Sequence, residues 1–120
     1  MKRADIRLRR AYDAPASDDG HRILVDRLWP RGVSRAGARL AEWARDLAPS
    51  DELRRWFGHE PQRWAEFQRR YRAELADKGD ELDRIAARAA QGRVTLVYGA
   101  RDERHNNAVV LRDVLARRQV

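Results

Sequence analysis

The sequence contains no cysteine and very little lysine or serine. The absence of cysteine excludes disulfides, thiolate nucleophiles, iron–sulfur clusters and cysteine-ligated zinc. The serines are Ser17, Ser34 and Ser50, and each lies in a turn or helix-cap context, so none is a persuasive nucleophile. Any chemistry must therefore use oxygen and nitrogen side chains.

Long apolar runs and several standard ligand motifs are also missing. No window approaches the roughly 18 to 20 consecutive apolar residues that a membrane span needs, and residues 1–5 lead into no apolar signal stretch. There is no Gly-x-Gly-x-x-Gly, no Walker A loop and no Gly-x-Ser-x-Gly elbow. We therefore expect a cytoplasmic protein that does not enter a membrane. The dinucleotide-binding, P-loop and α/β-hydrolase classes lose support.

The composition is that of a folded, basic chain. Of the 120 residues, 42% are hydrophobic and 38% are charged, which predicts one domain over residues 1–120 with a buried core and a wet surface. Lys and Arg exceed Asp and Glu by 26 to 19. The arginine pairs are spread along the chain, mostly beside carboxylates: Arg9-Arg10, Arg54-Arg55, Arg69-Arg70 and Arg117-Arg118. This spread favours solvated helix faces over a nucleic-acid-binding surface, which remains an alternative.

Four segments are predicted to form strands. Residues 5–9 alternate between apolar and charged side chains, as a half-buried edge strand does. Residues 23–25 and 94–98 are continuous apolar runs, typical of strands buried on both faces of a parallel sheet. Residues 40–48 fit both a helical stripe and strand alternation, and we favour a strand.

Helices are predicted between and after these strands. Ser50 can cap a short helix that ends at Gly58, and Pro61 opens a longer helix. An aromatic stripe on the longer helix is predicted to be core: Trp64, Phe67 and Tyr71, followed by Leu75. Asp80 can cap a third helix, with Gly92 as its left-handed C-terminal residue, and a final amphipathic helix ends the chain. The order predicts a compact α/β domain with a partly parallel sheet of about four strands flanked by helices.

Polar residues follow three of the predicted strands. The segments are 26–32, 46–50 and 98–107. Because ligands of open α/β sheets bind beyond the carboxyl ends of the strands, we expect Arg27, Arg31 and Arg101 to form a cationic pocket for a phosphate or carboxylate. Ion pairs that merely join loops, with Asp26, Asp46 or Asp102 as partners, explain these arginines equally well.

Other side chains in these segments have two interpretations each. His105 is the best candidate acid or base, but it can equally cap its helix. Asn106 is more often an N-cap than a catalytic amide, and Trp29 is more often packed than stacked on a ligand. His21 is expected in an exposed turn. The spacing of Asp102, Glu103 and His105, with His59, matches no strong metal-ligand motif, so no metal site is predicted and the cofactor is left open.

Several long strings resemble one family over nearly the whole chain, the YeaO-like bacterial proteins of the family called domain of unknown function 488. The strings are Tyr12-Asp13, residues 19–32, 47–50, 53–59 and 100–103, and His105-Asn106. The resemblance implies a small bacterial cytoplasmic α/β protein. It carries over no established reaction and therefore no catalytic residues.

The leading hypothesis is a domain that binds a small anionic ligand at the strand ends. The expected ligand-binding residues are Asp26, Arg27, Trp29, Arg31, Arg101 and Asn106. Whether the protein is an enzyme is left open; if it is, His105 with Asp46 or Asp102 transfers protons. The alternatives are a nucleic-acid-binding module and an interaction protein whose stripe of Trp64, Phe67 and Tyr71 is partly exposed. The oligomeric state is not predicted.

Overall fold

The computed structural model describes residues 4–118, and a four-stranded parallel sheet lies at its centre. The strands are β1 (Ile6–Arg10), β2 (His21–Leu24), β3 (Glu42–Trp43) and β4 (Val94–Tyr98), in the spatial order β1-β4-β2-β3. All three neighbouring pairs are parallel, and Val94 lies opposite Ile6 on one side and His21 on the other. The predicted α/β class is confirmed, and the sheet is parallel throughout.

Strand positions explain the two hydrophobic patterns. All five residues of β4 are buried because the strand lies between β1 and β2 and is covered on both faces. This accounts for its continuous apolar run. The edge strand β1 is mostly half-buried, which accounts for its alternating sequence.

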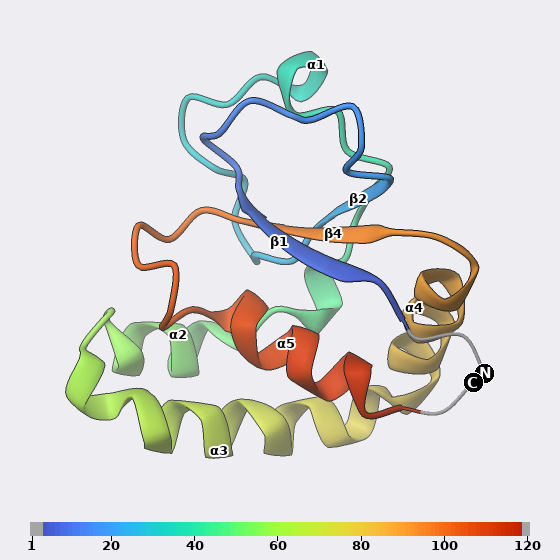
Figure 1. Cartoon of the computed structure of the whole chain (residues 1–120). Helices are drawn as coiled ribbons and strands as arrows, with labels where there is room; N and C mark the ends of the chain where they lie inside the picture. Colours follow the sequence, from blue (N-terminus) through green and yellow to red (C-terminus); the bar gives the residue numbers. More distant parts are fainter. Residues whose placement is uncertain (1–3, 119–120) are drawn as a thin grey trace.

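Four helices cover one face of the sheet (Figure 1): α2 (Asp51–Phe57), α3 (Trp64–Leu75), α4 (Gly79–Gln91) and α5 (Asn107–Ala116). Three short 3₁₀ turns precede α2, α3 and α4: η1 (Arg45–Leu47), η2 (Pro61–Arg63) and η3 (Ala76–Lys78). Helix α5 packs against β1 and β4 and contacts α3 and α4. None of the helices in the described residues is long and apolar enough to cross a membrane.

Loops and the one-turn helix α1 (Arg35–Ala38) lie over the other face (Figure 1). A small apolar cluster centres there on Ala11, Leu24 and Val97. Arg22 lies two residues before Leu24 and so faces the same side, where it pairs with the buried Asp19. This face thus combines a thin apolar cover with a buried ion pair.

The structure corrects the strand that was predicted over residues 40–48. Only Glu42 and Trp43 pair with β2, opposite Ile23 and Leu24, because β2 itself ends at Leu24. The chain then forms the turn η1, which buries Leu47. His21 is corrected as well: it lies in β2, half-buried, with Nε2 2.7 Å from Glu42 Oε2.

The third helix ends at Gly92 as predicted, but its predicted N-cap and the predicted left-handed conformation of Gly92 are wrong. Helix α4 begins at Gly79 and follows α3 through the η3 turn, so Asp80 lies in the first turn of α4 rather than at its cap. Gly92 has a φ of 171° and is extended, because the chain runs directly into β4. The inward face is as predicted, with Leu82, Ile85, Ala86 and Ala89 buried.

Ser50 caps α2 as predicted and also ties it to α3. Its Oγ accepts the N–H of Leu53 at 3.1 Å and donates to Glu74 Oε2 at 2.6 Å. We expect Ser50→Ala to lower the free energy of unfolding by about 1 kcal/mol, since a capping bond and a bond to a carboxylate are lost together. Urea unfolding measures this. Ser17→Ala, in an exposed turn, is the control and should change stability by less than about 0.5 kcal/mol; equal effects would contradict the capping role.

Candidate functional site

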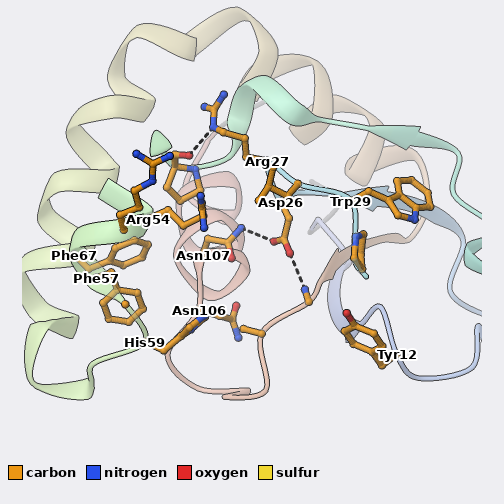
Figure 2. A pocket seen from close by; sticks show the side chains of 17 residues that line it. Tyr12, Asp26, Arg27, Trp29, Arg54, Phe57, His59, Phe67, Asn106 and Asn107 are labelled. Carbon is orange, nitrogen blue, oxygen red and sulfur yellow. Dashed lines mark hydrogen bonds between the residues drawn. The ribbon is translucent and has the colours of Figure 1, made fainter. Parts of the chain in front are cut away.

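A cleft of about 390 Å³ lies where β1, β2 and β4 end. The residues after these strands, the end of α2 and the start of α5 line it (Figure 2). We call it the sheet-end cleft. Its polar side chains are Tyr12, Asp26, Arg27, Arg54, Arg55, His59, Asn106 and Asn107. The cleft therefore lies where ligands of open parallel sheets bind.

Asp26 follows β2 and lies in the middle of the cleft (Figure 2). Its Oδ2 accepts the N–H of Gly99 at 2.8 Å and its Oδ1 accepts from Asn107 Nδ2 at 3.1 Å. The carboxyl thus joins the end of β2 to the residue after β4 and to α5. Burial raises the pKa of Asp26, although both hydrogen bonds and the charge of a protonated His59 act in the opposite direction.

Arg27 forms part of the wall of the cleft. Its Nε donates to the carbonyl of Pro49 at 3.0 Å and its Nη2 to the carbonyl of Ala48 at 3.4 Å. No carboxylate in residues 4–118 forms a salt bridge with it. The backbone bonds fix the guanidinium in place while its charge stays uncompensated by a direct partner.

Helix α2 brings further positive charge to the cleft. Arg54 and Arg55 lie in its last turn, and His59 follows its left-handed cap Gly58. His59 is itself left-handed, with a φ of 59°, and its ring lies 6.1 Å from that of Phe57. A second consecutive left-handed residue is unusual for a non-glycine side chain, and it places the imidazole at the cleft. Among the described residues, the one carboxylate near Arg54 is that of Asp51, at a long 3.5 Å.

The start of α5 forms the remaining polar wall. Asn106 is the N-cap, with Oδ1 accepting the N–H of Val109 at 3.1 Å and Nδ2 donating to the carbonyl of Asp102 at 2.9 Å. The predicted capping role is confirmed, and its amide is used there. Asn107 Nδ2 donates to Asp26 and to the carbonyl of Val25. These bonds hold the start of α5 against the end of β2.

The structure brings only some of the predicted residues together. Asp26, Arg27, Trp29 and Asn106 line the sheet-end cleft, whereas Arg31 and Arg101 are exposed and do not. Trp29 is occupied on several sides. Its Nε1 donates to the carbonyl of Val33 at 2.7 Å, and Trp43 and Arg35 contact its ring.

His105 and Asp102 bond to each other outside the cleft. His105 Nδ1 lies 2.9 Å from Asp102 Oδ2, and the histidine ring contacts Trp64 edge-on. The backbone N–H of Arg104 and the bond to His105 lower the pKa of Asp102, so this carboxyl stays ionised. The arrangement orders the loop before α5.

Asp46 lines a second cavity, of about 300 Å³, behind the segment Ala48–Ser50. Arg27 lines both cavities.

Across the described range 4–118, no three His, Asp or Glu side chains are placed to hold a metal ion together.

Most of the arginine pairs are involved in ion pairs. Examples are Arg9 with Asp19, Arg69 and Arg70 with Glu66, and Arg118 with Asp83.

Phe67 and Tyr71 of the aromatic stripe are buried, which leaves half-buried Trp64 as the part that another chain could contact.

Five polar residues of the cleft were not among the expected ligand-binding residues, and of these only His59 was considered, as a metal ligand: Tyr12, Arg54, Arg55, His59 and Asn107. A signal existed for some of them. Residues 53–59 form one of the strings that carry the family resemblance, and Asn107 lies in the polar segment after the last strand. Nothing in the sequence indicated that α2 ends beside Asp26.

Comparison with known proteins assigns the family. The model of the family described as "Inactive DUF488-N3 subclade" matches residues 5–119. The chain belongs to the DUF488 family. The resemblance expected from the motifs is confirmed. The chain is 43% identical over 111 residues to the uncharacterised protein YeaO of Escherichia coli K12, covering 92% of this chain and 96% of that protein.

Relatives also occur in mycobacteria. The uncharacterised proteins Mb3100c of Mycobacterium bovis and Rv3073c of Mycobacterium tuberculosis H37Rv are each 38% identical over 117 residues, covering 96% of this chain and 97% of theirs. No solved structure was found to match the chain.

Proposed function

We propose that this DUF488 protein binds a small anionic ligand, carrying a phosphate or carboxylate group, in the sheet-end cleft. One observation carries the proposal: Arg27, Arg54, Arg55 and His59 line a single cleft at the strand ends. Arginine's planar fork suits the oxygens of phosphate and carboxylate, and charge-assisted bonds are about twice as strong as neutral ones. Within the described residues, Arg27 and Arg55 have no carboxylate partner that would compete with a ligand.

The apolar side chains of the cleft support a site for an organic molecule. Leu28, Pro30, Pro49, Phe57 and Phe67 line it beside the charged groups. The cleft's volume of about 390 Å³ falls within the range of small-molecule sites. Arg27 is half-buried, and the lower local dielectric there strengthens its attraction for an anion.

The residues that line the cleft favour binding of the ligand without its chemical conversion. The predicted proton-transfer residues His105, Asp102 and Asp46 do not line the sheet-end cleft. The description of the matching subclade as inactive points the same way. The ligand would therefore be held rather than converted.

Arg55→Ala tests the cationic wall. We expect the affinity for inorganic phosphate or succinate to fall about tenfold, because one charge-assisted contact is lost. Calorimetric titration measures the affinity. Amide chemical shifts of Gly58, Gly99 and Asn107 show whether the anion lies in the cleft.

Arg112→Ala is the matched control, because Arg112 is an exposed helical arginine that does not line the cleft. It should leave anion affinity unchanged. Equal losses in both variants would indicate a general charge effect and contradict the site. Absence of binding by either anion to the wild-type protein would contradict the proposed function.

A further inference from the structure

Asp26 is the one carboxylate among the described residues that line the sheet-end cleft. It lies among Arg27, Arg54, Arg55 and His59, in a site that we propose for an anion. An ionised carboxylate there would repel an anionic oxygen brought close to it. A carboxylate fixed in a cationic cleft would therefore distinguish among the anions that reach it.

The carboxyl group cannot easily turn away from the cleft. The N–H of Gly99 and Nδ2 of Asn107 hold its two oxygens at 2.8 and 3.1 Å. A Cβ at residue 99 would lie 3.1 Å from Oδ2, so the backbone after β4 approaches the carboxyl as closely as only glycine comfortably allows. Each carboxylate oxygen accepts about two hydrogen bonds, which leaves capacity on both oxygens for a ligand.

The groups around Asp26 come from every element packed against it. The charge of His59, which follows α2, acts on Asp26, and Asn107 of α5 bonds to it; Tyr12 from the loop after β1 and the arginines of α2 line the same cleft. Tyr71 of α3 lies beneath; its pKa is raised by burial and further by the charge of Asp26. Because this tyrosine stays neutral, it does not take part in the proton exchange between Asp26 and the ligand.

We propose that Asp26 makes the cleft selective for anions that bring a proton, such as hydrogen phosphate, over fully ionised oxyanions such as sulfate. This inference rests on the proposed function and specifies its ligand. A proton between the carboxyl and the ligand oxygen turns repulsion into a charge-assisted hydrogen bond. Inorganic phosphate still carries such a proton, as hydrogen phosphate, at mildly alkaline pH, whereas sulfate carries none. A phosphate monoester, whose second pKa is about 6, brings a proton only at or below about that pH.

Sulfate can bind well only if Asp26 takes up the proton itself. The raised pKa of Asp26 makes this uptake easier as the pH falls. The affinity for sulfate should therefore rise as the pH is lowered, while the affinity for phosphate changes less because either partner can hold the shared proton. Selectivity for phosphate is then greatest at mildly alkaline pH.

The test compares inorganic phosphate with sulfate, two tetrahedral anions of similar size, by calorimetric titration at constant ionic strength. At mildly alkaline pH we expect phosphate to bind the wild-type protein at least about tenfold more tightly, since an unpaired ligand oxygen would face a carboxylate in the sulfate complex. In Asp26→Asn the amide donates to either anion, so sulfate affinity should rise and the ratio should approach one. Asp80→Asn removes an exposed carboxylate outside the cleft and should keep the wild-type ratio.

The outcomes separate the two proposals. Equal binding of both anions to the wild-type protein at alkaline pH would overturn proton selectivity and leave anion binding intact. No binding of either anion would overturn both. Asp26→Asn loses a bond to Asn107 and could fold poorly, so the wild-type protein is also titrated across pH. A phosphate-to-sulfate ratio that does not fall towards acidic pH would overturn the inference without any variant.

Discussion

Replacing Asp19 by alanine is expected to lower the free energy of unfolding by about 3–5 kcal/mol, because it leaves the charge of Arg22 buried without a counterion. Asp19 and Arg22 are only 5% and 4% exposed. Arg22 Nη1 donates to Asp19 Oδ2 at 2.6 Å, and Nε donates to the carbonyl of Ala38 at 3.0 Å. In the described residues, Nη2 of Arg22 is already buried without a partner. Urea unfolding measures the loss.

The pH dependence separates the ion pair from simple packing. Burial acts to raise the pKa of Asp19, but bonds from the N–H of Ala16 and from Arg22, with the charge of Arg9, outweigh it and lower the pKa. A lowered carboxyl pKa contributes stability above its unfolded value of about 4, and this stability is lost as the pH falls through the folded pKa. The difference between wild type and Asp19→Ala should therefore shrink below about pH 4.

A double variant is the control for this prediction. In Asp19→Ala with Arg22→Met no fully buried charge is left unpaired, and only the half-buried Arg9 loses its carboxylate, so part of the lost stability should return. A single-variant loss below about 1 kcal/mol, or one that is independent of pH, would show that the pair matters less than its burial indicates.

Phe67→Ala is expected to cost about 3–5 kcal/mol of unfolding free energy. Phe67 is 2% exposed and its ring stacks on that of Phe57, with centroids 4.4 Å apart. It also lines the sheet-end cleft, so the void left by its removal would loosen the end of α2 that carries Arg54 and Arg55. Phosphate binding should weaken together with stability.

Gln68→Ala is the neighbouring control on α3. Gln68 is half-buried and does not line the cleft, so its truncation should change stability by less than about 0.5 kcal/mol and leave binding unchanged. Loss of stability in Phe67→Ala with full anion affinity would show that the cleft does not depend on this ring.

Several elements could be predicted because their determinants are local. The apolar run of β4, the Ser50 cap with Gly58 at the end of α2, and the spacing of Phe67, Tyr71 and Leu75 each lie within one segment, and the structure confirms them. The wrong predictions concern segments whose structure depends on neighbouring elements. Residues 40–48 form a strand only where β2 offers a partner, and the start of α4 depends on continuation from α3 through η3.

The sequence predicted where the cleft lies on the sheet better than it predicted which side chains line it. Asp26 and Arg27 follow a buried strand, and the carboxyl ends of parallel strands meet at one edge, so their place in a cleft follows from the pattern. Arg31 lies in the same segment as Asp26 and Arg27, and Arg101 lies in the segment after β4, but both are exposed and do not line the cleft. Loop conformation decides the direction of such an exposed side chain. Arg54 and Arg55 have the sequence pattern of a solvated helix face.

The sequence by itself determined the family, the α/β class and the edge of the sheet where the cleft lies, since each depends on hydrophobic periodicity or on long matching strings. Tertiary structure alone decided which cations share the cleft and that Asp26 is held among them by Gly99 and Asn107. These residues are 73 and 81 positions from Asp26 along the chain, and only the pairing of β4 with β2 and the packing of α5 against β4 bring them into contact.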